Sequence, residues 1–343
     1  MQAIRVAIIG YGKAAKTFHL PFINALTSYQ LTAISTSQRE ALQADYPDVE
    51  HYMDASELIE KSDADLIVIT APNKAHYPLA KLAIAHGKHV LLEKPFVLNM
   101  AEGESLIAQA KAAGVVLTVN HNRRLDGDFF TIKQLIAEKK LGELKLFESH
   151  YDRFRPTVRQ RWRENAGEPG SGILYDLGAH LIDQALELFG LPDKLTAHAL
   201  SQRHNSQVVD YYHLILHYPS HQAILHSSSF CAAPALRFHL EGELGSYQKY
   251  GMDGQEEQLV DGHVEFAAEG ELGSEQGYLY TQDTKQLITN QKGRYYHFYQ
   301  QLAAAIQQQQ PLLVTAEQAL ETIRLIGLAM QSEKEQRTLS VPK

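Results

Sequence analysis

A glycine-rich turn near the N-terminus limits the folds open to this chain more than any other feature. The run from Ile4 to Ile9 is apolar, as in a buried parallel strand, and the turn Gly10–Ala15 follows it directly with the pattern G-x-G-x-x-A. A turn that only needs a positive φ would also favour glycine. The strand before it, the helix after it and the phosphate-attracting N–H groups at the start of that helix favour a pyrophosphate. We therefore predict dinucleotide binding by Gly10, Tyr11, Gly12 and Ala15.

Alternating strand-like and helical segments continue to about residue 121. Further apolar runs occur at 31–35, 66–70, 89–92 and 115–119, with helix-length segments between them. This order is typical of a doubly wound parallel sheet, so residues 1–121 are predicted to form a Rossmann domain. The length of 343 residues agrees with two domains at about 150 residues each.

The remainder, residues 122–343, has a different pattern. Helices are expected at Leu125–Lys139 and Asp176–Phe189, and strands dominate from Leu195 to about Tyr280. This pattern predicts an α+β domain with an open, mainly antiparallel or mixed sheet, so that the whole chain is of the α/β class. The acidic stretch Gln255–Gly277 is expected to form a solvated hairpin.

Charge and cysteine content restrict the partners. The chain has 32 basic and 40 acidic side chains, a net charge of −8, which disfavours nucleic acid and anionic membranes. The single cysteine, Cys231, excludes an internal disulfide and a multi-thiolate metal site. No run approaches the roughly 18 apolar residues of a membrane span, and no signal segment precedes the first strand. We expect a soluble cytoplasmic protein.

The end of the second predicted strand bears on the choice of cofactor. NAD enzymes usually place an acid about 20 residues after the glycines, where it holds the ribose 2′-OH. Here the chain has no acid before Glu40. Hydroxyls followed by arginine suit a 2′-phosphate, although a merely polar strand end would look the same. The sequence favours NADP, with NAD as the alternative, and the predicted contacts are Ser35, Thr36, Ser37 and Arg39.

Polar residues follow three other predicted strands, at the edge where α/β sheets bind ligands. They lie in the segments Thr70–His76, Glu93–Pro95 and Asn120–Arg124. Lys94 could donate to a substrate oxygen and stabilise negative charge on it. Farther along, Asp176 and His180 are four residues apart, which on a helix places them on one face. A histidine can take the proton of an alcohol while a carboxylate orients it, although such a pair alone is more often a surface contact.

Together these motifs resemble the Gfo/Idh/MocA oxidoreductases. The resemblance rests on Gly10-Tyr11-Gly12, Glu93-Lys94-Pro95 and the glycine-rich stretch that leads to Asp176 and His180, and it covers essentially the whole chain. It is closest to the NADP-linked scyllo-inositol dehydrogenase-like branch. That closer match is carried by Tyr11-Gly12 with Thr17–His19, by Asn122–Arg124 and by Glu148–Pro156.

The resemblance implies a catalytic group of Lys94, Asp176 and His180, and a Lys94–Pro95 bond in cis. It also implies an open C-terminal sheet that serves as the substrate-side wall and as the interface of a homodimer or homotetramer. The substrate residues would be Lys94, Asn122, Arg123, Asp176 and His180. The cofactor would further contact Ala71, Pro72, Asn73, His76, Glu93, Lys94 and Asn122.

The leading hypothesis is an NAD(P)-dependent oxidoreductase that transfers hydride between nicotinamide and a secondary hydroxyl or carbonyl of a cyclic polyol, sugar or similar small molecule. Two alternatives stay open. One is a non-catalytic NAD(P)-binding sensor, against which the retained Lys94, Asp176 and His180 argue. The other is an enzyme of the same family that holds its cofactor tightly and catalyses a different net reaction.

Two further features were weighed as binding sites. The arginines of residues 153–163 form the one basic cluster, which is too local for nucleic acid and fits a loop near ligand anions, where Trp162 and Arg163 could touch ligand. His213 and His217 would lie about 13 Å apart on a strand, too far to share an ion. No metal site is therefore expected.

Overall fold

The computed structural model describes residues 2–159, 164–263 and 276–342 and separates into two compact units. Unit 1 contains the chain up to Asn122 together with helix α9 (Gln255–Val260) and residues 294–320. Unit 2 contains residues 123–254, 276–293 and 321–342. The sequence assigned every residue after 121 to the second domain, whereas two later segments return to the first.

Aromatic packing explains this return of the chain. Helix α11 (Tyr295–Gln308) contributes Tyr299, whose ring stacks on Phe22 with centroids 5.3 Å apart. The Tyr29 hydroxyl also donates to the Tyr299 carbonyl over 2.6 Å. Burying these rings in unit 1 removes a large apolar area from water, which neighbouring residues in the sequence could not reveal.

Unit 1 is a six-stranded parallel sheet in the order β3-β2-β1-β4-β5-β6, the strand order of a doubly wound dinucleotide-binding fold. All four residues of β4 are buried, as expected for a central strand covered on both faces. The prediction of a Rossmann sheet is confirmed. The strands are β1 (Ile4–Ile9), β2 (Tyr29–Ser35), β3 (Glu50–Tyr52), β4 (Leu66–Ile69), β5 (His89–Leu92) and β6 (Leu117–Val119).

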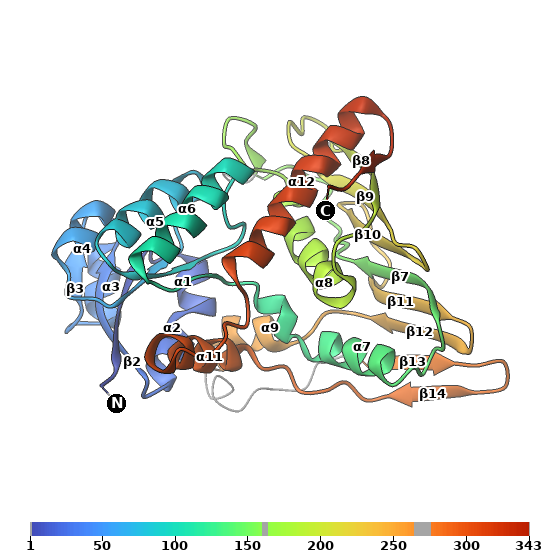
Figure 1. Ribbon diagram of the computed structural model, residues 1–343, viewed down its shortest axis with the longest axis horizontal. Helices are drawn as coiled ribbons and strands as arrows, with labels where there is room; N and C mark the ends of the chain where they lie inside the picture. Colours follow the sequence, from blue (N-terminus) through green and yellow to red (C-terminus); the bar gives the residue numbers. More distant parts are fainter. Residues whose placement is uncertain (1, 160–163, 264–275, 343) are drawn as a thin grey trace. The chain divides into compact units, whose positions relative to one another are not determined.

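Helices connect these strands, and α5 and α6 lie side by side in Figure 1. The helices before residue 122 are α1 (Lys13–Phe18), α2 (Leu20–Ala25), α3 (Arg39–Asp45), α4 (Ala55–Lys61), α5 (His76–Ala85) and α6 (Met100–Ala113). The segment expected to be a hairpin begins instead with helix α9. There Glu256 pairs with Lys13 of α1 over 3.2 Å. The rest of that expectation, residues 264–275, lies outside the described residues.

Unit 2 contains a nine-stranded sheet in the order β14-β13-β12-β11-β7-β10-β9-β8-β15. Among the described strand pairs of this second sheet only β7–β10 is parallel, so the predicted mixed, mainly antiparallel sheet is confirmed. Its strands are β7 (Leu144–His150), β8 (Lys194–Leu200), β9 (Tyr211–His217), β10 (Gln222–Ser228), β11 (Leu236–Gly242), β12 (Gly245–Tyr250), β13 (Gly277–Tyr280), β14 (Lys285–Ile288) and β15 (Leu339–Ser340).

The two faces of this sheet differ. On β9, Tyr212, Leu214 and Leu216 are buried, whereas His213 and Ile215 between them are only half-buried. Helix α8 (Ala179–Phe189) packs against the sheet at β10 (Figure 1). We call the half-buried side, which includes His213 and Ile215, the open face. The remaining helices are α7 (Gly127–Ala137) and α12 (Ala316–Glu335), and no helix among the described residues is long and apolar enough to span a membrane.

Candidate functional site

The glycine turn after β1 has the conformation that its sequence predicted. Gly10 has φ +102°, and a Cβ there would lie 2.5 Å from Oγ1 of Thr70, so only glycine fits. Gly12 is different, because within the described residues no atom other than those of its chain neighbours lies within 4 Å of a Cβ placed on it. Protein packing therefore does not require glycine at position 12, and the open space beside it suits the close approach of a pyrophosphate. Ala15 is fully buried, which lets α1 pack closely.

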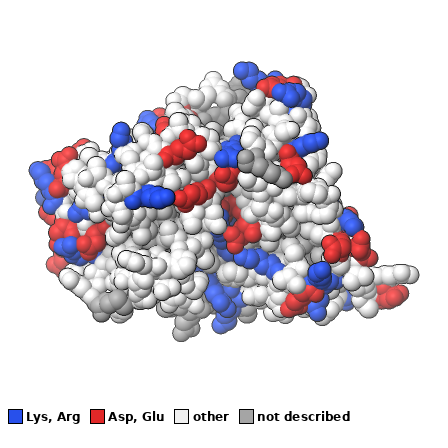
Figure 2. All heavy atoms as spheres, viewed as in Figure 1, with Lys and Arg blue, Asp and Glu red and all other residues white. Residues whose placement is uncertain are grey.

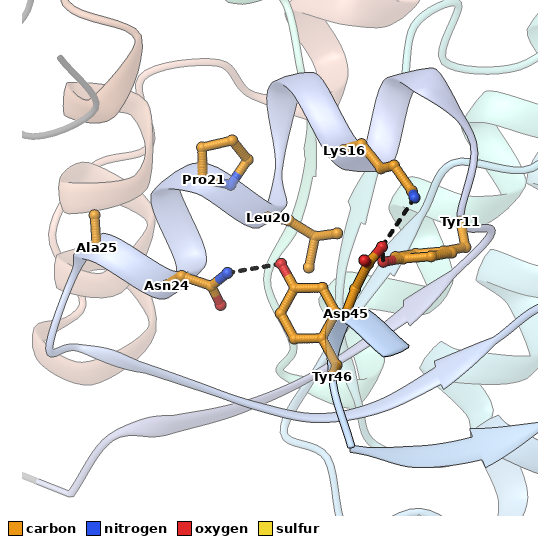
Figure 3. Close-up of a pocket in the computed structure, with 8 residues that line it drawn as sticks. All are labelled: Tyr11, Lys16, Leu20, Pro21, Asn24, Ala25, Asp45 and Tyr46. Carbon is orange, nitrogen blue, oxygen red and sulfur yellow. Dashed lines mark hydrogen bonds and ion pairs between the residues drawn. The ribbon is translucent and has the colours of Figure 1, made fainter. Parts of the chain in front are cut away.

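The Tyr11 side chain, predicted to contact the cofactor, points into a pocket of about 590 Å³ formed with α1, α2 and α3 (Figure 3). Its hydroxyl donates to Asp45 over 2.5 Å, and Nζ of Lys16 lies 3.2 Å from the same carboxylate oxygen. Burial and then this carboxylate raise the pKa of Tyr11 above its usual range. The ring thus braces the turn against α3. The pocket is lined by Tyr11, Lys16, Leu20, Pro21, Asn24, Ala25, Asp45 and Tyr46.

The residues at the end of β2 divide into two buried and two exposed. Ser35 and Thr36 are buried, and Oγ1 of Thr36 accepts a hydrogen bond from the Gln38 amide over 3.0 Å. Ser37 and Arg39 are exposed. This strand end therefore presents one exposed hydroxyl and one exposed guanidinium, and none of the four positions carries a carboxylate.

His76 holds two loops of unit 1 together. Its Nδ1 lies 2.9 Å from the Pro95 carbonyl and its Nε2 lies 3.0 Å from the Ala71 carbonyl. Burial lowers the pKa of His76, although the hydrogen bonds to these two carbonyls act to raise it. The loop that begins with Ala71, Pro72 and Asn73 is thereby fixed beside the Lys94–Pro95 peptide, which is cis as expected. His76 was predicted to contact the cofactor, and its contacts in unit 1 show that its ring also positions these two loops.

Glu93, the residue before Lys94, accepts hydrogen bonds from two side chains. The Asn120 amide donates to its Oε1 over 2.7 Å, and Nε2 of His19 lies 2.7 Å from the same oxygen. Nδ1 of His19 in turn lies 2.5 Å from the Tyr299 hydroxyl. Burial alone would raise the pKa of Glu93, but His19, Asn120 and Lys94 together lower it. The Glu93 carboxylate is therefore held charged beside Lys94.

In unit 2, Asp176 and His180 occupy the junction of two kinds of helix. Asp176 lies in a π-helical turn (Leu174–Gly178), and His180 lies in the first turn of α8. The spacing argument assumed a regular α-helix, whereas a π turn closes i→i+5 hydrogen bonds and changes which side chains are neighbours. Gly178 packs closely inside this turn, because a Cβ there would lie 2.9 Å from Cδ1 of Leu174 and would require that side chain to shift.

Arg124 ties the start of unit 2 to α8. Its Nε and Nη2 donate to the two carboxylate oxygens of Asp183 over 2.8 and 2.7 Å, and Nη1 lies 3.1 Å from Glu187. This bidentate geometry fixes both partners. Because Asp183 is three residues after His180, Arg124 also helps to set the position of that histidine. Sequence reasoning noted Arg124 only as part of a motif and missed Asp183.

Arg123, a predicted substrate residue, belongs to a buried hydrogen-bonded chain in unit 2. Its Nη2 donates to the Tyr151 hydroxyl over 2.9 Å, and its carbonyl accepts from Nε2 of Gln184 over 2.8 Å. The guanidinium of Arg237 then donates to the Gln184 side-chain oxygen over 2.8 Å. None of these three partners was predicted as a site residue. Tyr151 was noted only within the segment Glu148–Pro156, and Gln184 and Arg237 belong to no motif.

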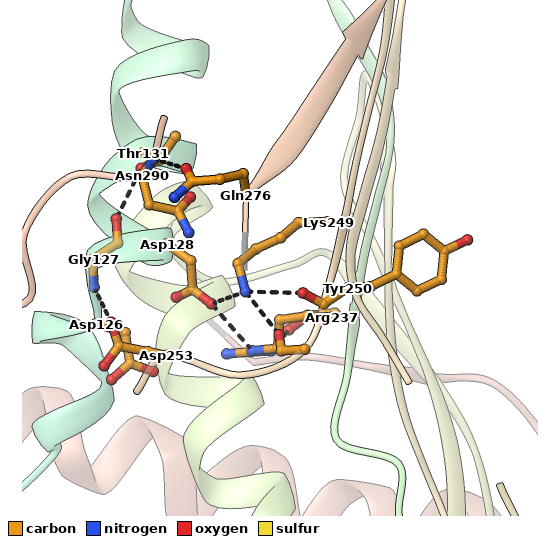
Figure 4. A network of polar contacts seen from close by, with 12 residues as sticks. Asp126, Gly127, Asp128, Thr131, Arg237, Lys249, Tyr250, Asp253, Gln276 and Asn290 are labelled. Carbon is orange, nitrogen blue, oxygen red and sulfur yellow. Dashed lines mark hydrogen bonds and ion pairs between the residues drawn. The ribbon is translucent and has the colours of Figure 1, made fainter. Parts of the chain in front are cut away.

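The Arg237 guanidinium also belongs to a buried cluster of charged side chains (Figure 4). Nζ of Lys249 is 3.2 Å from Oδ2 of Asp128, and Nε of Arg237 is 4.0 Å from the same oxygen. All three side chains are at most 1% exposed. Lys249 also donates to the carbonyls of Tyr250 and Gly251 over 3.2 and 2.8 Å. Buried charges of this kind require every partner to be present.

The basic segment 153–163 is described only in part. The guanidinium of Arg153 lies 4.6 Å from the centre of the Tyr151 ring, and the amide of Arg159 donates to Glu164 over 2.7 Å. Arg161, Trp162 and Arg163 lie outside the described residues. On the face seen in Figure 2, Lys and Arg side chains are interspersed with Asp and Glu.

The predicted site residues thus fall into two groups. Unit 1 contains the glycine turn, the β2 end, the Ala71–His76 loop, Glu93, Lys94 and Asn122, whereas unit 2 contains Arg123, Asp176 and His180. Within unit 1 the structure brings Ala71, His76 and Pro95 together, and it joins Glu93 to Asn120. The exposed turn at Gly12, the end of β2 and the loops after β4 and β5 fit a dinucleotide in character.

Comparison with known proteins identifies the same family that the sequence motifs resemble. Residues 4–121 match the Gfo/Idh/MocA model described as "Oxidoreductase family, NAD-binding Rossmann fold", and residues 133–341 match its C-terminal alpha/beta domain. The chain is 43% identical to the uncharacterized oxidoreductase YdgJ of Escherichia coli over 98% of both chains. It is 40% identical to scyllo-inositol 2-dehydrogenase (NADP(+)) IolW of Bacillus subtilis over 99% of this chain and 96% of that one.

A solved structure extends the likeness to three dimensions. The oxidoreductase yvaA of Bacillus subtilis superposes with a TM-score of 0.94 at 38% identity, covering 99% of both chains. The two domain models name the same family that the sequence motifs resemble, and the likeness to these relatives covers nearly the whole chain. The chain belongs to the Gfo/Idh/MocA oxidoreductase family and is an NAD(P)-dependent dehydrogenase.

Proposed function

We propose that the protein is an NADP-preferring dehydrogenase that acts on a secondary hydroxyl of a cyclic polyol or sugar, or on the corresponding carbonyl. The observation that carries this proposal is the 40% identity, over nearly the whole chain, to a scyllo-inositol 2-dehydrogenase (NADP(+)). The chain contains a single cysteine, Cys231, which agrees with a reducing compartment. We therefore place the enzyme in the cytoplasm.

Each of three residues has a role suited to its chemistry. NADP(H), when bound, supplies the acceptor or donor of hydride. In the oxidative direction, His180 takes the proton of the substrate hydroxyl, and Asp176 orients the imidazole and stabilises its cation. Lys94 donates a hydrogen bond to the same substrate oxygen and stabilises its developing negative charge. Arg123 and Asn122 bind the remaining hydroxyls of the substrate.

The proposal includes a preference for NADP, which rests on the residues at the end of β2 in unit 1. Ser37 and Arg39 are exposed at the end of β2, and neither Ser35 nor Thr36 carries a charge that would repel a 2′-phosphate. Arginine is well suited to phosphate because its planar guanidinium can donate two parallel hydrogen bonds. We expect a preference for NADP over NAD of roughly tenfold or more, about 1.4 kcal/mol.

A steady-state assay tests the proposed reaction. Cyclic polyols including scyllo-inositol, aldoses and keto-sugars are each supplied with NADP or NAD, and the absorbance of reduced nicotinamide is followed over many turnovers. The proposal predicts sustained formation of free NADPH with at least one cyclic polyol or sugar. A single burst that stops at one equivalent per chain would point instead to the tightly held cofactor, and no turnover with any substrate would favour the sensor.

We also propose that the enzyme is a homodimer or homotetramer that pairs through the open face of the unit-2 sheet. Ile215 and Ile224 are directly opposite on β9 and β10 and both are half-buried, and Tyr278 of β13 is 38% exposed. Covering these side chains would remove apolar surface from water. Light scattering at micromolar concentration should show a dimer or tetramer, with Ile224→Lys shifted toward monomer. A monomeric wild-type protein would contradict this.

A further inference from the structure

Three potential metal ligands converge on the open face of the unit-2 sheet. His150 ends β7, Asp152 follows two residues later, and His226 lies on β10, directly opposite His150 in the parallel pair. One ligand atom from each residue can be chosen so that all lie within 4.8 Å of one another. No local sequence pattern indicates this group, because His150 and His226 are separated by two intervening strands and their connections.

The contacts within the group are close, and one of them is not a hydrogen bond. Oδ2 of Asp152 lies 3.3 Å from Nδ1 of His150, and Oδ1 lies 2.9 Å from Nδ1 of His226. Despite the 2.9 Å separation, Nδ1 of His226 is a buried atom that forms no hydrogen bond within the described part of the chain. Unbonded buried nitrogens are costly, and an ion shared with the carboxylate would satisfy this one.

Surrounding residues hold two of the ligands in place. Nε2 of His150 lies 3.4 Å from Oε2 of Glu148, which leaves Nδ1 for the group. A histidine that gives one nitrogen to an ion and donates the other to a carboxylate is the usual outer arrangement of a metal site. Oδ1 of Asp152 also accepts from the Ser228 amide over 2.7 Å.

We propose that His150, Asp152 and His226 bind one divalent transition-metal ion of the Zn²⁺ class, with water completing the coordination. Two imidazoles and one carboxylate suit such ions, and the three ligands leave a fourth position open. This inference departs from the expectation of no metal, which had considered only histidines close together in the sequence. Glu148 is the outer partner that orients His150.

The ion would clip the ends of β7 and β10 together. Ser227, beside His226, donates to the Tyr151 carbonyl over 2.7 Å, and Tyr151 accepts from Arg123. A bound ion therefore stabilises the ends of β7 and β10, and through Tyr151 it also helps to hold Arg123 in place. The site is structural in this account, so its main effect is on stability and not on the hydride-transfer step.

Two other histidines of the open face provide a contrast. Along the sheet, His198, His213, His226 and His150 are in register on four adjacent strands. The ring centre of His213 is 5.8 Å from that of His226, while His198 has a side chain 59% exposed at the end of the row. Neither belongs to the converging group, and His198→Asn is the matched control because it removes a histidine from the same row.

The test uses the full-length, tag-free protein after removal of metal with a chelator. Zn²⁺ affinity is measured by competition with a chromophoric chelator, and Co²⁺ serves as a spectroscopic probe. We expect one ion per chain, a visible Co²⁺ spectrum distinct from that of the aqueous ion, and a higher Tm with Zn²⁺. Asp152→Asn and His226→Asn should each weaken Zn²⁺ binding by about 100-fold or more, whereas His198→Asn should not change it.

Circular dichroism and cofactor binding establish that each variant is folded before its Zn²⁺ affinity is compared. Absence of saturable binding by the wild type would overturn the proposal, as would equal affinities of wild type and folded Asp152→Asn. If His198→Asn weakened binding as much as His226→Asn, the ion would belong to the exposed histidine row, and the proposed ligand set would be wrong.

Discussion

Nε2 of His19 lies 2.7 Å from Oε1 of Glu93, with the imidazole fully buried. The Tyr299 hydroxyl lies 2.5 Å from the other ring nitrogen, so both nitrogens of His19 are engaged. Glu93 directly precedes Lys94, and the hydrogen bond from the Asn120 amide restricts the movement of the Glu93 side chain. A charged carboxylate is thus fixed beside the proposed oxyanion donor by residues from three distant parts of unit 1.

Removing the Glu93 charge should therefore disturb Lys94. Glu93→Gln keeps the size of the side chain but removes the charge that faces His19 and Lys94, and we expect kcat to fall about tenfold, 1.4 kcal/mol in activation free energy. Glu102→Gln, on the first turn of α6, is the control and should retain wild-type kcat. A folded Glu93→Gln enzyme with unchanged kcat would show that the charge at Glu93 does not assist Lys94.

The buried pair of Asp128 and Lys249 should be costly to break. Asp128→Asn leaves the Lys249 ammonium without its counter-ion in a fully buried place, so the free energy of unfolding should fall by about 3–5 kcal/mol. The control is Glu243→Gln, which breaks an exposed pair with Lys145 that is 2.7 Å long and should cost under about 1 kcal/mol. Denaturant unfolding measures both, and similar losses would mean that burial does not set the cost.

Asp65 should contribute stability that depends on pH. Arg5 donates to both its oxygens over 3.0 and 2.7 Å, and these hydrogen bonds lower the pKa of Asp65 below its ordinary value of 3.8. A lowered carboxyl pKa stabilises the fold above the unfolded-state value, and this stability is lost as the pH falls through the folded-state pKa.

Because the Asp65 side chain is 38% exposed, solvent screens the pair and we expect only about 1 kcal/mol. The difference in unfolding free energy between wild type and Asp65→Asn should be full at pH 6 and shrink steadily below about pH 4. An unfolding series in denaturant across this range provides the measurement. A difference that stays constant down to the acid limit would refute the assignment.

Cofactor preference should be reversible at Thr36. Its Oγ1 accepts from the Gln38 amide, and a carboxylate oxygen can accept the same hydrogen bond, so Thr36→Asp should fold. The added charge repels a 2′-phosphate and can accept from a ribose 2′-OH, which should favour NAD. Thr36→Asn is the uncharged control and should keep the NADP preference. The ratio of kcat/KM values for the two cofactors decides, and a higher wild-type value with NAD would contradict the assignment.

Local patterns in the sequence predicted the Rossmann domain well. The glycine turn, the buried runs and the cis Lys94–Pro95 bond all depend on residues that are neighbours in the chain or on a motif. The return of α11 to unit 1 could not be predicted in this way, because it depends on Tyr299 packing against Phe22. The π turn at Asp176 was also missed, since helical periodicity does not distinguish it from a regular α-helical turn.

The supporting residues of the site were harder to predict than the motif residues. Glu93, Lys94, Asp176 and His180 stand in recognisable motifs, whereas Tyr299 and Asp183 are identified only by what they contact. The metal-ligand group of His150, Asp152 and His226 depends on the parallel register of β7 and β10, which no local pattern specifies.

The central claim is that Lys94 and His180 act directly on the substrate oxygen. The most direct measurement is kcat for Lys94→Ala and His180→Ala with saturating polyol or sugar and NADP, alongside the cofactor Kd of each variant. Loss of an oxyanion donor or of a general base typically costs about 10² or more in rate, so both kcat values should fall by at least that factor. The NADP Kd of His180→Ala should stay near that of the wild type, and the exposed-histidine control His86→Ala should retain full activity. Folded, NADP-binding variants that keep near-wild-type kcat would contradict the account.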